Sequence, residues 1–449
     1  MGAPELFLLT DTRVLTRTTS ERCGIGQGSF RSRSNPMTTV QSSRTIGVIC
    51  SVTDPCPPHR NGSIQAVVAD AIFALARAGH TIHLFASDDS ATAWRGVPNV
   101  VFHPVGTNNL RGRGMEGPYA EWCERWVYMP RALRAAARAQ LDVLHIHDLR
   151  AMMALAADPQ LEARLPPTFA TCHWDPTHLA IAPVLRAWAP RPLVAISQAQ
   201  QRTAPEHTWL GVVYNGLDAE LFSPRPLGVP VQPQWLREVL GNWHRDHPPP
   251  PPLVFVARMA PEKGPDIAIR AAVRAGRPLL LAGKIDATER PFFDTAVAPL
   301  LARYVESVTY LGEVARTDVR DLFRYAASRG GALIHPHCWD EPFGLSPAEA
   351  LLCGCPVIAT NRGAAAEIIT DPATGTLVPY TSDRDTLAES FGLAISKHEQ
   401  PCDSKRCRNA GLRFSRTAMG HSYAQLCTQL ARSPARVRTH GKEKTVIAA

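Results

Sequence analysis

The sequence lacks any apolar stretch long enough to cross a bilayer. Polar or charged residues interrupt its longest hydrophobic runs well before the roughly 20 residues that a membrane-spanning helix needs. The run "LFLLT" at 6–10 is too short for the core of a signal peptide, and no basic residues precede it. We therefore expect neither a membrane span nor a secretory signal.

Cysteines at metal-binding or redox spacing are also missing. The 11 cysteines form no C-x-x-C motif, and an odd number cannot pair completely within one chain. This pattern indicates a reducing compartment, so we expect a cytoplasmic protein, with membrane association as an open alternative.

Basic residues do not interleave with aromatic residues in the manner of single-strand-binding proteins, so we expect no nucleic-acid partner. Part of the net charge of +8 lies in the tail, residues 432–449, and part in an arginine-containing leader, residues 1–44. Such terminal charge is usually solvated, but a basic tail could also rest on an acidic membrane surface as a peripheral contact.

Two α/β halves are predicted between these ends. The leader has no apolar periodicity, which indicates a disordered segment, a transit peptide or a true start at Met37. Short β-rich runs alternate with helical stretches over residues 45–223 and again over 253–431, which is typical of parallel sheets covered by helices. Prolines crowd residues 224–252, which we interpret as a linker.

The expected elements follow this alternation. In the first half we expect strands at 45–50, 81–86, 100–105, 142–147, 168–173, 192–197 and 211–216, with helices at 63–80 and 119–139. In the second half we expect strands at 253–258, 278–283, 308–312, 331–336 and 356–360, with helices at 265–275, 291–304, 317–327 and 347–353. Ligands of open α/β sheets bind beyond the carboxyl ends of strands, so a cleft between the halves is the predicted site.

The stretch "DEPFGLSPAEALLCGCPVIAT" at 340–360 places two glutamates around a glycine turn. Ser346, Pro347 and Glu349 match a capping box, with serine at the N-cap and glutamate three residues later. Helix capping is therefore one interpretation of Glu349. Glu341 precedes the turn and cannot cap this helix, whose first amides would suit a phosphate or sugar hydroxyls.

A second stretch, "ARMAPEKGPDIAIRAA" at 257–272, sets two cations near a helix start. Arg258 ends a predicted strand, and Lys263 precedes a helix expected to begin near Pro265. Cations at this position oppose the helix dipole unless an anion lies between, so an anion site is implied. The alternative is a solvent-facing pair offset by Glu262 and Asp266.

A metal site is a weaker interpretation of "HPHCWDE" at 335–341. His335, His337 and Cys338 supply suitable ligand types, but residues on a strand that ends in a proline-flanked turn need not converge. We expect no metal and no cofactor.

Five motifs in order resemble the family-4 retaining glycosyltransferases, also called glycosyl transferases group 1, whose fold is GT-B. They are "VVYNGLDAELF", "VFVARMAPEKGPDIAI", "VTYLGEV", "EPFGLSPAEALLCGCPVIATNRGAAAEII" and "GTLV". The segment "PHRNGSIQAVVADAIFALARAGHTIHLFAS" is similar to the family's N-terminal glycine loop and helix. The resemblance spans about Thr45 to Val378 and implies two Rossmann-like domains facing each other across a cleft.

The resemblance also implies roles for named residues. Arg258 and Lys263 would bind the diphosphate of a UDP- or GDP-linked sugar, and Glu349 would bind the ribose hydroxyls. Glu341 would lie beside the donor sugar, with backbone contacts from Phe343, Gly344 and Leu345. The base would lie near Val314. His147 of "HIHD" would face the sugar across the cleft, whereas we expect His145 to point to the opposite strand face; His173 is a further candidate.

Two departures from the family pattern concern the acceptor side. The family's paired glycines read here as Asn61 and Gly62, and Ile64 stands where many relatives carry glutamate. The acceptor, whether carbohydrate, lipid or small molecule, is therefore open. Sugar transfer is the function that the resemblance implies; the alternatives are an epimerase or phosphorylase on the same fold, or a nucleotide-sugar-binding protein without turnover.

Overall fold

The computed structural model describes residues 43–58, 62–115, 117–224, 234–239, 250–398 and 403–432. Most of the leader with Met37, Asn61, most of the proline-rich linker and the tail beyond Arg432 lie outside the described residues. The predictions made for them therefore stay predictions.

The first half is built on a seven-stranded parallel sheet in the order β3-β2-β1-β4-β5-β6-β7. Its strands are β1 (Thr45–Ile49), β2 (Thr81–Ala86), β3 (Val100–Pro104), β4 (Val143–Ile146), β5 (Thr168–Cys172), β6 (Leu193–Ala195) and β7 (Trp209–Val212). Its helices are α1 (Ser63–Arg77), α2 (Ala91–Trp94), α3 (Gly117–Cys123), α4 (Met129–Ala136), α5 (Leu149–Ala156), α6 (Pro159–Glu162), α7 (Ala182–Trp188) and α8 (Gln198–Thr203). A π-helical turn, Glu124–Tyr128, joins α3 to α4.

The second half has a six-stranded parallel sheet in the order β10-β9-β8-β11-β12-β13. Its strands are β8 (Leu253–Val256), β9 (Leu279–Ala282), β10 (Val308–Tyr310), β11 (Ala332–His335), β12 (Val357–Thr360) and β13 (Gly375–Val378). Its helices are α10 (Pro265–Arg274), α11 (Arg290–Phe292), α12 (Ala298–Arg303), α13 (Arg316–Ser328), α14 (Leu345–Leu352), α15 (Ala365–Ile368), α16 (Arg384–Lys397) and α17 (Ser404–Leu412). A short helix, α9 (Gln234–Val239), falls within the predicted linker.

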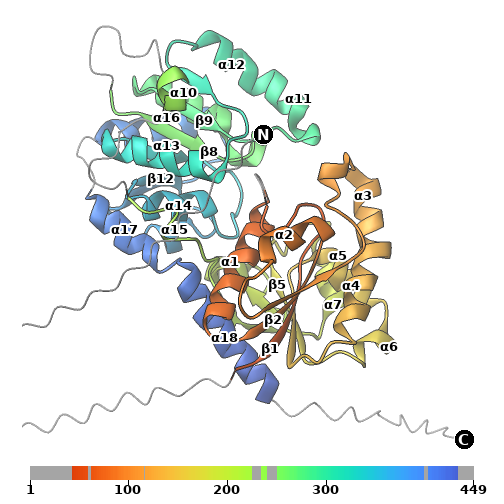
Figure 1. Cartoon of the computed structure of the whole chain (residues 1–449). Coiled ribbons are helices and arrows are strands. Elements are labelled where there is room, and N and C mark those ends of the chain that lie inside the picture. Colours follow the sequence, from red (N-terminus) through yellow and green to blue (C-terminus); the bar gives the residue numbers. More distant parts are fainter. Residues whose placement is uncertain are drawn as a thin grey trace, which may run out of the picture. The chain divides into compact units, whose positions relative to one another are not determined.

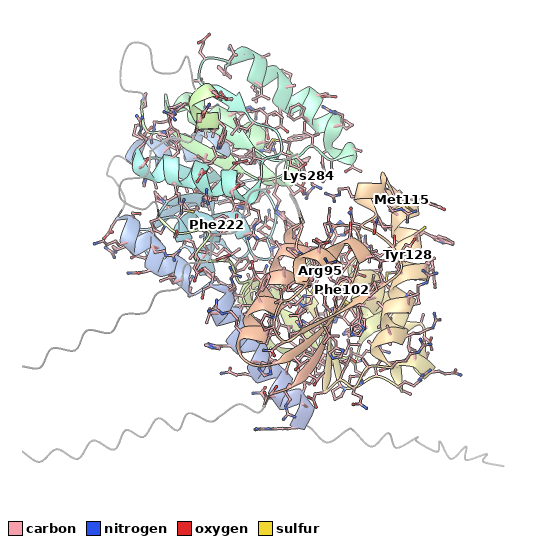
Figure 2. All side chains as sticks on the ribbon, viewed as in Figure 1. Arg95, Phe102, Met115, Tyr128, Phe222 and Lys284 are labelled. Atoms are coloured by element: carbon pink, nitrogen blue, oxygen red, sulfur yellow. The ribbon has the colours of Figure 1, made fainter. Side chains whose placement is uncertain are left out.

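The two parallel sheets confirm the α/β class expected from the sequence. Strands β1, β4, β8 and β11 lie inside their sheets and are buried almost throughout, which is typical of strands covered on both faces. Side chains fill the space between sheets and helices in both halves (Figure 2). Several boundaries differ: the strand expected at 211–216 occupies Trp209–Val212, and the helix expected at 119–139 is divided into α3, the π-helical turn and α4.

The last helix, α18 (Arg416–Arg432), returns to the first half and runs beside α1 (Figure 1). Met419 and Tyr423 are buried in the same cluster as β1 and α1. At Gly420 the two helices approach so closely that a β-carbon would collide with Ala74. The predicted second domain therefore contributes its final helix to the core of the first.

Candidate active site

Two adjoining cavities of about 160 and about 450 Å³ lie where α1 approaches the carboxyl ends of β8 and β9 and the first turn of α14. Residues of both halves line each cavity. Those common to the two are Gly62, Ser63, Val67, Ala257, Arg258, Lys284, Leu345 and Ser346. Two cavities therefore lie at the predicted location, beyond the carboxyl ends of the strands.

The turn before α14 does not form the predicted capping box. The helix begins at Leu345, with Gly344 at the N-cap and a backbone φ of 101°, a conformation that favours glycine. Ser346 lies inside the first turn, and its hydroxyl donates to the carbonyl of Val256 at 2.7 Å. Glu349 therefore lies one turn into the helix and does not cap it. The sequence pattern alone left open whether this glutamate caps the helix or binds a ligand.

Glu341 lies in the larger cavity and forms an ion pair with Lys263. The indole Nε1 of Trp339 donates to its Oε2 at 2.9 Å, and the Lys263 ammonium lies 4.7 Å from the centre of the Trp339 ring. Burial alone would raise the pKa of Glu341, but the Lys263 ammonium, with His335 and His337, lowers that pKa to about 2. Two predicted site residues are therefore in direct contact, both charged.

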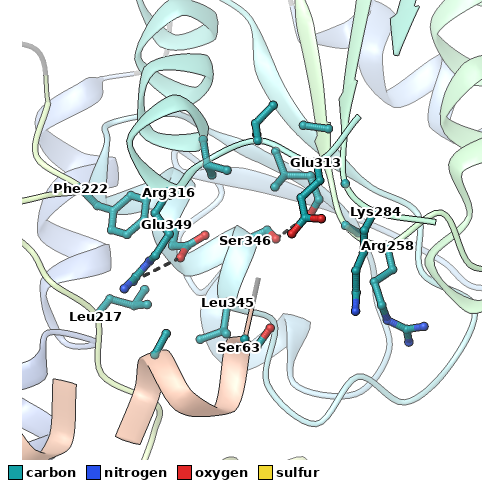
Figure 3. Close-up of a pocket in the computed structure, with 18 of the residues that line it drawn as sticks. Ser63, Leu217, Phe222, Arg258, Lys284, Glu313, Arg316, Leu345, Ser346 and Glu349 are labelled. Carbon is teal, nitrogen blue, oxygen red and sulfur yellow. Dashed lines mark hydrogen bonds and ion pairs between the residues drawn. The ribbon is translucent and has the colours of Figure 1, made fainter. Parts of the chain in front are cut away.

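Arg258 and Lys284 lie side by side at the junction of the cavities (Figure 3). Arg258 contacts Glu262 at 2.6 Å, as the solvent-facing alternative expects, and Glu289 at 3.4 Å. Lys284 contacts Asp286 at 2.7 Å and was not singled out from the sequence, because nothing marks a lysine that follows a strand. Both cations have acidic neighbours outside the cavity and still line it.

Asp266, the other expected counter-ion, does not neutralise Lys263. It is buried and pairs with Arg384 and with Arg270, the latter at 3.3 Å. Lys263 therefore has Glu341 as its carboxylate partner in the structure, which differs from the solvent-facing pair considered above.

Glu349 and Arg316 lie next to each other in the lining of the smaller cavity and form an ion pair, with 3.8 Å between carboxylate and guanidinium (Figure 3). The same guanidinium lies 3.8 Å from Asp70 of α1, so it is shared by carboxylates from both halves. Burial raises the pKa of Glu349 to about 7; Arg316 opposes this rise and Asp70 adds to it. Burial also raises the pKa of Asp70. Sequence patterns gave no signal for Arg316 or Asp70, because they come from separate helices.

The remaining residues predicted on the donor side have different surroundings. Val314 lines the smaller cavity, and Gly344 and Leu345 line the larger one. Phe343 borders the larger cavity, but its ring is buried and packs 5.4 Å from that of Phe414. Its side chain therefore belongs to the core, and its backbone is what faces the cavity.

His147 ends a buried hydrogen-bonded group on the wall supplied by the first half. Its Nδ1 lies 2.8 Å from Nε2 of His173, and its Nε2 is buried without a partner. Burial lowers the pKa of His147 well below its usual value, and the neighbouring His145 and His173 lower it further, so the ring is neutral. Its Nε2 could accept or donate a hydrogen bond, but this nitrogen has almost no exposed surface, so the ring would have to rotate slightly to bring it into the cavity.

The expected orientation of His145 is wrong. Residues two apart in a strand share a face, and the rings of His145 and His147 are 3.8 Å apart. His145 Nε2 lies 2.7 Å from the Thr171 hydroxyl, which lies 2.9 Å from that of Tyr423 on α18. The ring of His145, held by Thr171, therefore packs against the ring of His147.

His335 and His337 pack with their rings 4.7 Å apart, and both ring nitrogens of His335 are buried without a hydrogen-bond partner. Both ring nitrogens of His337 contact backbone carbonyls, those of His335 and Arg362, at 3.1 and 3.0 Å. Within the described ranges, no group of three or more His, Cys, Asp or Glu side chains could hold a metal ion. The absence of metal dependence stays a prediction.

On the acceptor side, Gly62 lines both cavities, while its neighbour Asn61 lies outside the described residues. Further polar side chains of the first half were not anticipated from the sequence. Those on the wall of the larger cavity include Ser51, Thr53, Asp54, Gln65, Arg111, Asp148, Arg150 and Asn215. In the part of the chain that the structure describes, no helix is both long and apolar enough to span a membrane.

Comparisons with known proteins agree with this architecture. The family model described as "Glycosyltransferase Family 4" matches residues 64–221, and that described as "Glycosyl transferases group 1" matches residues 243–411. D-inositol 3-phosphate glycosyltransferase of Mycobacterium tuberculosis (strain F11) is 30% identical over 178 residues, 38% of this chain and 32% of that protein. Probable sucrose-phosphate synthase 5 of Oryza sativa subsp. japonica is 28% identical over 206 residues, 43% of this chain and 20% of that protein. The chain thus aligns with less than a third of these relatives' length.

Solved structures resemble the fold over most of the chain. Sucrose-phosphate synthase from Thermosynechococcus elongatus has a TM-score of 0.64 at 20% identity, with 86% of this chain and 99% of that chain covered. HepE of Anabaena, solved with UDP and glucose, has a TM-score of 0.64 at 20% identity, with 86% and 100% covered. The chain therefore has the GT-B fold and belongs to the glycosyl transferases of group 1, family 4.

Proposed function

We propose that this chain is a retaining glycosyltransferase that moves a sugar from a UDP- or GDP-linked donor to a hydroxyl group of an acceptor. The observation that carries this proposal is the set of charges at the junction of the cavities. Three cations, Arg258, Lys263 and Lys284, line the larger cavity beside the first turn of α14, while Glu341 and Glu349 flank that turn. Glu341, the three cations and Glu349 thus follow one another in the order that the sugar, the diphosphate and the nucleoside have in a nucleotide sugar.

The diphosphate is the group that these cations would bind. Arg258 and Lys284 have carboxylate partners and also line the cavity, so a phosphate can join existing ion pairs without breaking them. The first amides of α14 have no carbonyl partner within their helix, and their dipole favours an anion. Leu345 and Ser346 would supply two of these amides.

The nucleoside would occupy the smaller cavity. Glu349 lies on one wall of that cavity and Val314 lies on its lining, so ribose hydroxyls can reach the carboxylate while the base contacts apolar surface. The solved HepE structures contain UDP or UDP-glucose, which makes UDP-linked sugars the first donors to test.

The sugar would occupy the larger cavity between Glu341 and His147. Glu341 is ionised because Lys263 lowers its pKa, so it can accept hydrogen bonds from sugar hydroxyls. His147 is neutral and lines the cavity on the opposite side. Its unpartnered Nε2 has almost no exposed surface, so a hydroxyl group would contact this nitrogen after a small rotation of the ring. These two residues position the anomeric carbon from both halves.

The reaction breaks the bond between the anomeric carbon and the phosphate oxygen and forms a bond from that carbon to the acceptor oxygen. Negative charge develops on the departing diphosphate, where Arg258, Lys263 and the α14 amides stabilise it. The departing phosphate oxygen takes the acceptor proton, and the new bond forms on the same face of the sugar. The chain's own cations supply the charge stabilisation in this proposal.

Incubation with a panel of nucleotide sugars tests the proposal. Slow release of UDP or GDP from one donor, with the anomeric configuration kept in any product, would support it. Interconversion of nucleotide sugars would indicate an epimerase, and release of a sugar phosphate by inorganic phosphate would indicate a phosphorylase. Tight binding without any product, across a range of acceptors, would indicate a binding protein; each of these results would contradict transfer.

A further inference from the structure

The carboxylate of Glu367, on α15 of the second half, is bound by groups of the first half. It accepts from the backbone amides of Gln198 at 2.9 Å and Ala199 at 2.6 Å, and from the Tyr214 hydroxyl at 2.8 Å. Gln198 and Ala199 are the first two residues of α8, whose amides have no carbonyl partner within that helix. The Glu367 side chain is only 13% exposed, and the Arg202 guanidinium lies 3.8 Å from it. This carboxylate therefore joins the two halves through hydrogen bonds.

Helix α8 also holds the loop that carries His173. Gln200, the third residue of this helix, is buried. Its Nε2 donates to the carbonyl of Cys172 at 2.8 Å and to that of Trp174 at 2.7 Å, so both chain neighbours of His173 are fixed. His173 and Trp174 line the larger cavity. The position of α8 therefore sets part of the wall that the first half gives to this cavity.

The turn before α15 is packed against the backbone of Glu341. The Ala364 amide donates to the Glu341 carbonyl at 3.0 Å, and the Ala364 carbonyl accepts from the Glu367 amide at 2.9 Å. Gly363 has a backbone φ of 57°, and a β-carbon at this position would collide with the Glu341 backbone. Helix α15 is therefore tied to the segment that presents the Glu341 carboxylate to the larger cavity.

We propose that Glu367 is a positioning residue, whose carboxylate holds the His173 loop and the Glu341 segment in place on the two walls of the larger cavity. A third cavity, of about 250 Å³, is lined by Ala199 from the first half and by Glu341 and Gly363 from the second, so side chains do not fill the space between the halves there. Hydrogen bonds from backbone amides to a carboxylate are strong and directional, and they can fix two segments where packing does not. This role rests on the proposed function, which places the donor sugar in the larger cavity.

Nucleotide binding and sugar transfer should depend differently on this contact. The side chains proposed to bind the nucleotide, Arg258, Lys263 and Glu349, all belong to the second half. Transfer also needs the wall of the first half, because the sugar is proposed to lie between the halves. Loss of the Glu367 contact should therefore lower turnover and leave nucleotide affinity unchanged. A residue that only stabilised the fold would not separate these two quantities.

Glu367→Gln in the full chain tests this role. The amide keeps the shape of the side chain, but its NH₂ group would face an N–H group of α8, so it cannot accept both amide hydrogen bonds. The donor is the most active of UDP-glucose, UDP-galactose and GDP-mannose with wild type. We expect release of nucleoside diphosphate from it to slow by roughly tenfold or more, since small displacements of reacting groups are costly. The Kd of that nucleoside diphosphate should stay within about twofold of wild type.

Hydrogen-exchange mass spectrometry of the same variant gives a readout that needs no activity. Exchange should be faster than in wild type in peptides that cover residues 172–174 and 196–203, because α8 has lost its partner in the second half. Exchange over α10, which lies in the second half, should be unchanged.

Two further variants complete the experiment. Asp371→Asn is the matched control, because Asp371 lies four residues after Glu367 and pairs within its own half, with Arg406 at 2.8 Å. It should leave both turnover and exchange unchanged. Tyr214→Phe removes one donor to Glu367 and should lower turnover by a smaller factor, again with nucleotide affinity unchanged. It replaces Glu367→Gln if that variant does not fold.

Three results would overturn the proposal: equal exchange in wild type and Glu367→Gln, faster exchange with unchanged turnover, or a parallel loss of turnover and nucleotide affinity. The second of these would make Glu367 a helix cap without a part in the reaction. A wild type that releases no nucleotide from any donor would contradict the proposed function instead. The exchange measurement would then still decide whether Glu367 holds the two segments in place.

Discussion

Lys263 and Glu341 are 78 residues apart in the chain and form an ion pair at the wall of the larger cavity. Their side chains are only 13% and 14% exposed. The pair joins the loop before α10 to the turn before α14, so the group proposed to bind phosphate and the group proposed to bind the sugar are held at one point. Each can be changed separately.

Lys263→Ala should weaken binding of UDP or GDP by roughly ten- to a hundredfold, since hydrogen bonds to charged groups contribute about 1.5–3 kcal/mol. Removal of the ammonium also leaves the Glu341 carboxylate near the phosphate without its cation. Isothermal titration calorimetry measures the affinity. Lys405→Ala, at an exposed position on α17, is the matched control and should bind like wild type. Equal affinity in Lys263→Ala would contradict the role given to Lys263.

Glu341→Gln should keep nucleotide affinity close to that of wild type and lower turnover of the nucleotide sugar by roughly a hundredfold, as removal of one preorganised electrostatic contact often does. The amide keeps the shape but loses the charge that faces the sugar. Steady-state release of nucleoside diphosphate measures turnover, and a nucleotide titration measures affinity. Parallel loss of both would show that Glu341 acts through the folding of the site.

The pH dependence of nucleotide-sugar binding should report Glu349. Its folded pKa is raised to about 7 by burial, so it is protonated over the range between its unfolded value and about 7. The stability that protonated Glu349 contributes to the fold is therefore fully present below its unfolded pKa, and it is lost as the pH rises from that value to about 7. A carboxylate that accepts ribose hydrogen bonds should instead make affinity rise with pH through about 7.

Titration of UDP-glucose at pH values on either side of this pKa measures the effect, because its diphosphate has no proton to lose in this range. Glu349→Gln should flatten the profile. Glu389→Gln, at a position 63% exposed on α16, should keep it. An unchanged slope in Glu349→Gln would assign the dependence to another group.

Arg316→Ala should destabilise the fold, because it leaves Glu349 without this cation and Asp70 with Arg416 alone, at 3.7 Å. The cost is about 1–3 kcal/mol, discounted for the 29% exposure of the arginine side chain. The loss of Tm should be larger above the raised pKa values of the two carboxylates than below them, since protonation removes their repulsion. Differential scanning calorimetry at a pH above these pKa values and at a pH below them measures the loss of Tm.

Arg316→Lys keeps the charge and should recover part of the loss. Arg77→Ala removes an exposed arginine from the last turn of α1 and serves as the control for surface charge. A Tm loss in Arg316→Ala that does not change with pH would mean that the guanidinium stabilises the fold through packing against Phe222, whose ring it covers at 5.3 Å.

Patterns local in sequence predicted the fold well, whereas contacts between distant segments were not accessible. Alternating strands and helices place Arg258, Glu341 and His147 near strand ends, and parallel sheets bring such ends to one edge. The structure has all three lining one cavity. No pattern in the sequence of α18 identifies α1 as its partner, because the residues that α18 buries pack against a helix more than 300 residues earlier in the chain.

Two errors have identifiable physical causes. The capping box fails because Gly344 takes a positive φ, so the helix starts before Ser346 and the serine hydroxyl bonds to Val256. The prediction that His145 and His147 point to opposite faces was wrong because residues two apart in a strand share a face. Arg316 and Lys284 were missed because their importance arises from their neighbours in space.

A crystal structure of the chain with UDP or GDP tests the central claim most directly. The account predicts the diphosphate within hydrogen-bonding distance of Arg258, Lys263 and the first amides of α14, with the ribose hydroxyls on Glu349. A nucleotide bound elsewhere, or a site in which Arg258 and Lys263 keep only their carboxylate partners at saturating nucleotide, would contradict it.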